Sequence, residues 1–311
     1  MSAWHVGLPT EALSAEDRVI AFNAAELASA RAANVATALG FHDAMAADLD
    51  RAGEVHVHLP TYRGLGLVPV LAWLAARLAA GGAAVSWYAA KQQGPDSIRK
   101  LLEGAGWRLE RDRSGRLVRL SGRPPAEPER PAPRRFIALL GDRQVELAAD
   151  FGVFSPERID DGTAVLLDVG LRHAPVDRVA DIGVGYAPLA IGLVLAGVAR
   201  SAVASDVDCI ALWLAAENAR ACGVPLALAC TPDPAAVAPA PLTVCNVPTH
   251  IDRHETERFM AALADRARTG HLLAVVHASL EGRYTRHLQG HGLRVRRHEG
   301  AVHVVLEACP R

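Results

Sequence analysis

The sequence lacks long apolar runs and an excess of charge of either sign. Its 311 residues carry 33 lysines and arginines against 34 aspartates and glutamates, a formal net charge of −1. No global basic field therefore marks it as a nucleic-acid or membrane-surface protein, and such a partner would be held by local patches. Uncharged apolar stretches such as residues 65–76 fall short of the roughly 20 residues that span a bilayer, and the first twenty residues contain no apolar signal region. We expect a cytoplasmic protein without a membrane partner.

Cysteine is also scarce, and no CxxC pair occurs. The five cysteines all lie in the last third of the sequence, which fits neither a disulfide framework nor a zinc ribbon. We interpret them as small core residues with reduced thiols. His250 and His254 stand four apart, but Ile251 replaces the glutamate of an H-E-x-x-H metal helix. We therefore expect no metal site.

One proline-rich segment divides the chain. Residues 121–135, SGRPPAEPERPAPRR, contain five prolines and no large apolar residue. This composition favours an extended, semi-rigid linker. It separates a domain of residues 1–120 from a domain of residues 136–311, each of an ordinary domain size.

Residues 136–311 alternate short β-rich runs with helical ones. A hairpin around Gly141 and Asp142 and a helix are followed by VDRVADIG, the apolar run PLAIGLVLAGV, and further strands and helices, ending in a pair of strands. The pattern predicts an α/β fold, in which helices cover a mostly parallel sheet that ends in an antiparallel C-terminal hairpin. In such sheets the ligand lies at the carboxyl ends of the strands.

The most informative strand end is DIGVGYAP, residues 181–188. Gly183 and Gly185 let the backbone turn sharply and approach a ligand, and the following helix presents its N–H groups there. The third glycine of a dinucleotide fingerprint would fall on Pro188, so that motif is incomplete. Asp181 suits a cationic ligand. Asp206, which ends the next strand, is placed to accept hydrogen bonds from both hydroxyls of a ribose, as in NAD and S-adenosylmethionine sites.

The fourth strand of this half ends in Asn246-Val247-Pro248-Thr249. These residues resemble the [D/N/S]-[I/P/V]-P-[aromatic] signature of amino-group methyltransferases. The resemblance implies that the Asn246 side-chain oxygen and the Val247 carbonyl accept hydrogen bonds from the target amine. Those bonds would align the nitrogen lone pair with the methyl group, so that catalysis is mainly positioning.

Taken together, the motifs resemble a smaller group within the amino-group methyltransferases. Residues 151–170, 181–193, 204–224 and 246–250 together resemble the bacterial rRNA (guanine-N2) methyltransferases of the "methyltransferase small domain" type, over roughly residues 150–280. This implies S-adenosyl-L-methionine as cofactor, no metal, and ribosomal RNA or a ribosomal subunit as partner. The implied cofactor-binding residues are Phe154, Asp181, Gly183, Gly185, Asp206 and Asp233, and the implied catalytic residues are Asn246, Val247, Pro248 and His250. Thr249 departs from the family, whose aromatic residue there stacks on the extruded base.

The first half contains an echo of this motif, VHLPTYRG, at residues 57–64. When Pro60 is aligned with Pro248, the elements that follow match to the end of each half, and the family is similar to tandem duplications whose first copy has lost the cofactor. We expect two tandem Rossmann-like domains, the first degenerate and used for substrate binding or stability. Its first strand is expected at residues 18–27, without a glycine loop, and Leu59 is expected at the position of Asn246.

Other features leave alternatives open. His56 and His58 are expected on opposite faces of their strand, which disfavours a joint site. The arginine-rich run of residues 108–135 fits an RNA-backbone footprint and a solvated hairpin about equally well. A non-catalytic RNA- or ribosome-binding protein with this fold stays possible, as does a methyltransferase that acts on a small molecule or a protein glutamine.

Overall fold

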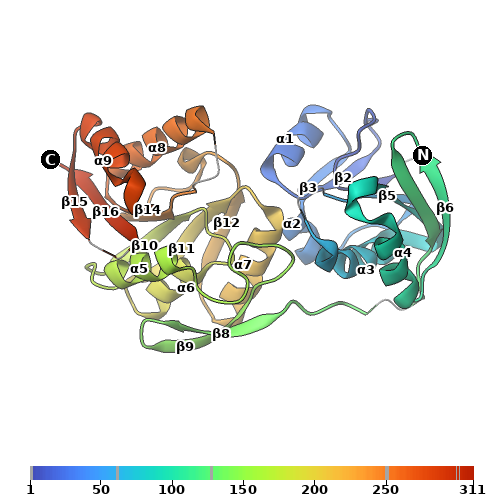
Figure 1. The fold of residues 1–311 in the computed structure, drawn as a ribbon, viewed down its shortest axis with the longest axis horizontal. Helices are drawn as coiled ribbons and strands as arrows, with labels where there is room; N and C mark the ends of the chain where they lie inside the picture. The colour runs from blue at the N-terminus through green and yellow to red at the C-terminus, as the bar shows by residue number, and fades with distance from the viewer. Residues whose placement is uncertain (1–2, 61–62, 127–128, 249–251, 299, 301) are drawn as a thin grey trace. The chain divides into compact units, whose positions relative to one another are not determined.

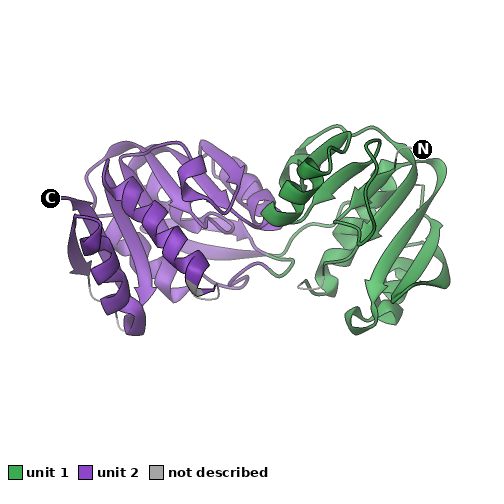
Figure 2. Cartoon of the chain, turned by 90° about the horizontal axis from the view of Figure 1, so that it is seen from above, with its two compact units in different colours: residues 1–134, 150–152 green, residues 135–149, 153–311 purple. Residues whose placement is uncertain are grey.

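Two seven-stranded sheets organise the chain, one in each of two compact units. Unit 1 comprises residues 1–134 and 150–152, and unit 2 comprises residues 135–149 and 153–311 (Figure 2). The computed structural model describes residues 3–60, 63–126, 129–248, 252–298, 300 and 302–311. Within these ranges, none of the helices has the length and apolar character needed to cross a bilayer.

The unit 2 sheet has the strand order β12-β11-β10-β13-β14-β16-β15 (Figure 1). The first five strands are mutually parallel, and β16 runs antiparallel to both of its neighbours. The prediction of a mostly parallel α/β fold with an antiparallel C-terminal hairpin is confirmed. The strands are β10 (Val176–Ile182), β11 (Ala199–Asp206), β12 (Leu226–Cys230), β13 (Leu242–Asn246), β14 (His271–His277), β15 (Leu293–His298) and β16 (His303–Pro310), with a separate hairpin of β8 (Arg135–Leu140) and β9 (Arg143–Ala148). The helices are α5 (Asp161–Gly170), α6 (Pro188–Leu195), α7 (Cys209–Ala221), α8 (Arg253–Ala267) and α9 (Glu281–Gly290), with short 3-10 turns η3 (Pro234–Ala236) and η4 (Ala278–Leu280).

Side chains of the unit 2 sheet alternate between two helix-covered faces. Ile182 and Cys245 belong to a buried cluster that includes Met260 of α8 and residues of α9. Because successive side chains of a strand point to opposite faces, Asp181 and Asn246 point to the other face. Helices α5 and α6, which contact each other, lie on that side. The residues that carry the predicted chemistry therefore share one face.

A buried asparagine of α7 holds the segment that follows β10. Asn218 has no exposed surface, and its side chain accepts from the Ala148 N–H at 2.7 Å and donates to the carbonyls of Ala148 and Tyr186 at 2.9 Å each. A buried amide is stable only when its hydrogen bonds are satisfied, and all three partners here are backbone groups. Asn218 thus ties the β8–β9 hairpin to the loop between β10 and α6.

The unit 1 sheet has the same order as that of unit 2, β3-β2-β1-β4-β5-β7-β6. Its last pair is again antiparallel. The strands are β1 (Trp4–Val6), β2 (Arg18–Ala21), β3 (Thr37–Gly40), β4 (Ala52–His58), β5 (Ala79–Ala90), β6 (Arg108–Ser114) and β7 (Leu117–Arg123), and the helices are α1 (Ala24–Ala32), α2 (Phe41–Ala46), α3 (Val68–Leu78) and α4 (Pro95–Gly104), with 3-10 turns η1 (Leu65–Leu67) and η2 (Lys91–Gln93). Since β7 continues to Arg123, the extended segment begins at residue 124 rather than at 121.

The first strand of unit 1 differs from the prediction. Strand β1, at the centre of the sheet, is the counterpart of β10, whereas residues 18–21 form β2, the counterpart of β11. A glycine also follows this strand: the Gly7 N–H donates to Ile20 O at 2.8 Å, as the Gly183 N–H donates to Ser205 O at 2.8 Å. The sequence comparison missed β1 because three residues carry little periodicity. Among the described residues, no helix separates β1 from β2.

The strand register also changes which residue of unit 1 corresponds to Asn246. Val6 pairs with Val57, and Ile182 pairs with Cys245. The residue that follows Val57 is His58, so His58, and not Leu59, stands where unit 2 has Asn246. The Leu59 N–H, bonded to the β5 backbone, corresponds instead to that of Val247, bonded to the β14 backbone.

His58 belongs to a cluster of stacked rings on one face of the unit 1 sheet. Its ring lies 4.7 Å from that of Tyr88 and 5.5 Å from that of His5, which is 5.0 Å from that of His56. The placement of His56 and His58 on opposite faces is wrong, because residues two apart on a strand share a face. Burial lowers the pKa of His58 to about 3, helped by His5 and His56, and burial also lowers the pKa of His5.

Acid is expected to destabilise unit 1 through this cluster. The pKa of His58 lies below its unfolded value of 6.5, so the neutral ring is favoured in the folded state and stability is lost as pH falls below about 6.5, by about 1.4 kcal/mol per pH unit until pH approaches 3. Asp17, 3.8 Å from His5, opposes the effect, because its charge raises the pKa of His5. In urea unfolding between pH 7.5 and pH 4.5, the wild type should lose more stability than His58→Gln by this slope, because the opposite contributions of the buried Asp181 and Asp206 are common to both. An equal slope in the variant would contradict the assignment.

Candidate active site

The turn between β10 and α6 leaves room for a ligand. Gly183 and Gly185 have φ angles of +77° and +56°, which residues other than glycine adopt only with strain. A Cβ atom built on either glycine would meet no heavy atom within 4 Å. The backbone is therefore bare where α6 begins, which is the arrangement that allows close approach of a ligand.

Asp181, two residues before Gly183, has a buried carboxylate whose two oxygens differ in their hydrogen bonding. The side chain is 1% exposed, and its Oδ2 accepts from the Ala190 N–H at 3.1 Å. The other oxygen, Oδ1, has no hydrogen-bond partner among the described residues. Burial raises the pKa of Asp181 to about 7, and the charge of Asp206 adds to this. A cationic ligand would stabilise the ionised form and satisfy the remaining oxygen.

Asp206 ends β11 and lies beside the same turn. Its Oδ2 accepts from the Gly185 N–H at 2.9 Å, and its Oδ1 accepts from the Asp208 N–H at 3.0 Å. These bonds fix the carboxylate while each oxygen keeps a second lone pair. Burial raises the pKa of Asp206 to about 6. A fixed carboxylate beside a glycine turn can accept hydrogen bonds from two adjacent hydroxyls, so the orphaned oxygen of Asp181, the open turn and Asp206 together fit an S-adenosylmethionine molecule.

Asn246 is held in one orientation by residues at the start of α5. Its Nδ2 donates to Asp160 Oδ2 at 3.0 Å and to Thr163 Oγ1 at 3.0 Å. Because a carboxylate only accepts hydrogen bonds, the side-chain atom of Asn246 that contacts Asp160 must be the amide nitrogen. None of the described residues donates to Asn246 Oδ1. That oxygen is therefore presented as an acceptor.

Asp160 is itself fixed, because it caps α5. Its side chain accepts from the Thr163 N–H at 3.1 Å, and Thr163 is 6% exposed. Asp160 lies within residues 151–170, which resemble the family, but the resemblance implies no role for it. The available signal was Asp160 immediately before an apolar helical run, which is typical of a helix N-cap. Only the fold shows that the same carboxylate also reaches Asn246, which is 86 residues away.

The structure places the other predicted cofactor residues around this region without assigning them a contact. Phe154 is 70% exposed on the loop that precedes α5, and the Tyr186 hydroxyl anchors this loop at the carbonyls of Ser155 and Arg158. Asp233, which follows β12, is exposed and caps η3 through the Ala235 N–H at 2.9 Å. Both assignments stay predictions.

The remaining predicted catalytic residues follow Asn246 directly. Val247 is 4% exposed, and its N–H donates to Val275 O at 3.1 Å. Pro248 is exposed. His250, like Thr249, lies outside the residues that the structure describes, so its predicted role is not addressed.

The matching positions of unit 1 do not form such a site. Ala21 stands where unit 2 has Asp206, as the register of β2 with β1 shows. Phe22, fully buried and 5.9 Å from the Phe41 ring, occupies space beside Gly7: a Cβ atom on that glycine would lie 2.8 Å from the Phe22 ring. These features support the prediction of a single cofactor site in the chain.

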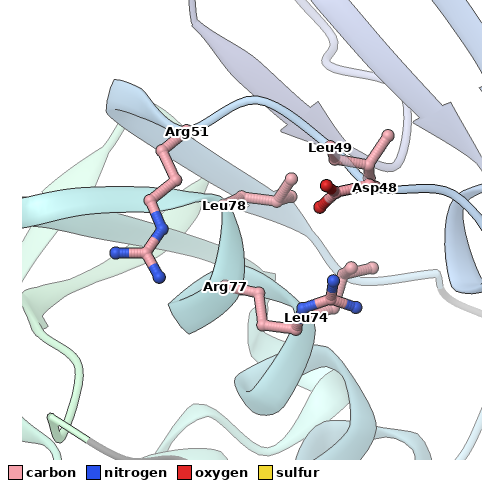
Figure 3. A pocket seen from close by; sticks show the side chains of 6 residues that line it. All are labelled: Asp48, Leu49, Arg51, Leu74, Arg77 and Leu78. Atoms are coloured by element: carbon pink, nitrogen blue, oxygen red, sulfur yellow. The ribbon is translucent and has the colours of Figure 1, made fainter.

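A small cavity in unit 1 lies at the opposite edge of its sheet. It measures about 80 Å³ and is lined by residues that precede β4 and by the C-terminal part of α3. Figure 3 shows the Asp48 carboxylate and the guanidinium groups of Arg51 and Arg77 around it. The cavity is too small for a nucleoside and lies away from the carboxyl ends of the strands, so we assign it no role in the site.

The strand order and the site together define the class of protein. A sheet ordered as in unit 2, with an acid near the end of β10 and a glycine turn after it, a second acid at the end of β11 and an Asn-Val-Pro turn at the end of β13, is that of a class I S-adenosylmethionine-dependent methyltransferase. Residues 144–296 match the family model of the methyltransferase small domain. The chain thus carries a methyltransferase small domain in unit 2.

Comparison with solved structures extends the likeness to both units. The chain is similar to the 16S rRNA N2 G1207 methyltransferase RsmC of T. thermophilus, solved with AdoMet and guanosine, with 20% identity, a TM-score of 0.73, and coverage of 100% of this chain and 88% of that chain. It is also similar to the ribosomal protein L11 methylase of Lactobacillus delbrueckii subsp. bulgaricus, with 20% identity, a TM-score of 0.44, and coverage of 56% and 98%. A search among curated proteins gave no match.

Proposed function

We propose that this protein transfers a methyl group to the exocyclic N2 of a guanine in ribosomal RNA. The observation that carries the proposal is Asn246, whose amide is oriented by Asp160 and Thr163 so that its oxygen is presented at the carboxyl edge of the sheet. The two-unit likeness to an rRNA guanine-N2 methyltransferase supports the substrate class. We place the protein in the cytoplasm, with ribosomal RNA or a ribosomal subunit as partner.

Three parts of unit 2 would hold the methyl donor. When bound, S-adenosylmethionine supplies an electrophilic methyl group. Asp181 would pair with the ammonium group of its amino acid end, and Asp206 would accept from its ribose hydroxyls. The bare backbone at Gly183 and Gly185 would admit it to the start of α6. Asp233 and Phe154 would add contacts at its edge.

The target amine would be held by acceptors alone. Asn246 Oδ1 and the Val247 carbonyl would each accept one N–H of the amine, which turns the nitrogen lone pair away from the protein and toward the methyl group. The nitrogen gains the methyl group and loses one proton to solvent, so no basic side chain is required. His250 and Pro248 would shape the turn around the amine. Because Thr249 offers no ring, His250 or a residue from elsewhere in the chain would stack on the base.

A transfer assay with tritiated S-adenosylmethionine tests the proposal. The protein is incubated with ribosomal subunits, with naked rRNA and with cell extract depleted of ribosomes, alongside Asn246→Ala as the inactive control. Label that enters rRNA and is recovered as N2-methylguanosine supports the proposal. Label that appears in a protein or a small molecule would move the activity to one of those substrates, and cofactor binding without label in any fraction would favour an RNA-binding role.

Asp160→Ala is expected to lower kcat by about 10- to 100-fold with little change in the KM for S-adenosylmethionine. The substitution removes one of the two bonds that orient Asn246, and misplacement by about 1 Å at a reacting centre can cost 100-fold. The lost cap also costs about 1 kcal/mol of stability. Asp160→Asn, which can still accept, should recover part of the rate.

The matched control for this variant is Asp161→Ala. Asp161 is the next residue, is exposed and pairs with Arg158, and it makes no recorded bond to Asn246. Steady-state kinetics of the three variants should separate orientation from stability. A kcat of Asp160→Ala equal to that of Asp161→Ala would remove Asp160 from the mechanism.

A further inference from the structure

Two cysteines that are distant in sequence meet beside the cofactor region. Cys209 is the first residue of α7, and Cys230 is the last residue of β12. Their sulfur atoms lie 3.2 Å apart, which is closer than a van der Waals contact between two sulfurs. Cys209 is fully buried, whereas Cys230 is half-buried and accessible from one side.

The sulfur pair flanks the carboxylate assigned to the ribose. Cys230 is the strand partner of Asp206 in the sheet, and the next N–H, that of Thr231, donates to Asp206 O at 3.0 Å. The Cys230 sulfur lies 3.9 Å from the carbonyl of Val207. On the other side, Cys209 follows Asp208 directly, and the Asp208 N–H holds Asp206 Oδ1. A movement of the two sulfurs is therefore transmitted to Asp206 by two routes. One is its strand partner Cys230, and the other is Asp208, which precedes Cys209 and holds Asp206 Oδ1.

We propose that Cys209 and Cys230 form a redox-active dithiol that a low-molecular-weight disulfide oxidises, and that the resulting bond weakens cofactor binding. Cys230, the accessible thiol, attacks the external disulfide as its thiolate and releases one thiol, which leaves a mixed disulfide. Cys209 then attacks the Cys230 sulfur and releases the second thiol. In total two protein thiols lose two protons and two electrons, and the external disulfide becomes two thiols. The inference rests on the assignment of Asp206 to the cofactor and does not depend on the RNA substrate.

The geometry sets the direction of the effect. A disulfide has a sulfur–sulfur length of about 2.05 Å, so the two atoms must approach by about 1.2 Å. That approach draws the start of α7 toward the end of β12 and changes the backbone at Asp208, whose N–H orients Asp206. Because hydroxyl recognition needs both carboxylate oxygens in place, we expect S-adenosylmethionine affinity to fall about 5- to 20-fold in the oxidised form, and to return on reduction.

The test uses the full chain equilibrated in reduced and oxidised glutathione. Alkylation followed by intact-mass measurement and peptide mapping should show loss of two thiols and a cross-link between the peptides of Cys209 and Cys230. Calorimetric titration with S-adenosylmethionine should show the weaker affinity before, but not after, treatment with dithiothreitol. Cys230→Ser and Cys209→Ala should abolish both the cross-link and the redox response. Cys222→Ser, which removes another half-buried thiol of unit 2, should retain both.

The outcomes separate this inference from the proposed function. Cross-linking with a reversible loss of affinity supports it even where no RNA is methylated. Absence of the cross-link under oxidising glutathione would overturn it, and so would unchanged affinity in the cross-linked protein or a response that persists in Cys230→Ser. If neither redox form binds S-adenosylmethionine, the assignment of Asp206 fails together with the inference.

Discussion

Asn246→Ala is expected to reduce methyl transfer by about 100- to 1000-fold while the dissociation constant of S-adenosylmethionine changes less than about twofold. The loss follows from removal of one preorganised hydrogen-bond partner of the reacting group, a change of this size in other enzymes. Asn246 makes its recorded side-chain bonds to Asp160 and Thr163 rather than to the residues assigned to the cofactor. Single-turnover transfer and calorimetric titration measure the two effects separately.

The counterpart position in unit 1 offers a control for this variant. His58→Gln alters the residue that stands where unit 2 has Asn246, in a unit where Ala21 replaces Asp206 and Phe22 occupies the space beside Gly7. At pH 7.5, where His58 is already neutral, it should leave turnover unchanged. Comparable turnover in Asn246→Ala and wild type would overturn the catalytic assignment of Asn246.

Asp206→Ala is expected to weaken S-adenosylmethionine binding by at least about 100-fold at pH 8. Each hydrogen bond to a charged group contributes about 1.5–3 kcal/mol, and two bonds from ribose hydroxyls are lost. Because the pKa of Asp206 is raised to about 6, the carboxylate form, which accepts both bonds, is present above that pH and is lost as pH falls through it. Wild-type affinity should therefore decline between pH 7 and pH 5, whereas this part of the decline should be missing in the variant.

A second titration is expected to persist in Asp206→Ala. Burial and the Asp206 charge raise the pKa of Asp181 to about 7, so removal of Asp206 should move this step to lower pH without abolishing it. Calorimetry in buffers of different ionisation enthalpy would show proton release on binding as the ligand cation favours the carboxylate. Asp177→Ala, an exposed residue at the amino end of β10 that pairs with Arg200, should bind as wild type does. Equal affinities of Asp206→Ala and Asp177→Ala would contradict the assignment.

The sequence was sufficient for the elements of unit 2 because each rests on local chemistry. The run PLAIGLVL forms α6 directly after a glycine turn, and LTVCN forms β13. The ends of these elements were recognisable because glycines with positive φ and prolines terminate them. Alignment of the Asn-Val-Pro turn with its echo also matched β4 with β13 and β5 with β14, which have the same places in the two sheets.

Unit 1 shows where this reasoning failed. Strand β1 has only three residues, so it leaves no pattern, and the first strand is predicted at residues 18–27, where the structure has β2 and the start of α1. The assignment of Leu59 to the position of Asn246 was also wrong by one residue, since Asn246 lies two residues before Pro248 and His58 lies two residues before Pro60, as the strand pairing shows. Register is set by pairing with β1 and β5, and a single step exchanges an inward for an outward side chain.

By itself the sequence determined which segments of the second half form strands and helices, that the chain contains two similar halves, and which motifs end the strands of the second half. These properties follow from residue periodicity and turn chemistry, which act over a few residues. The tertiary structure alone decided which distant groups meet: Asp160 with Asn246, Cys209 with Cys230, and three histidines with Tyr88. The reason is that strand order and register bring together residues that lie 21 to 86 positions apart, and no local pattern encodes those pairings.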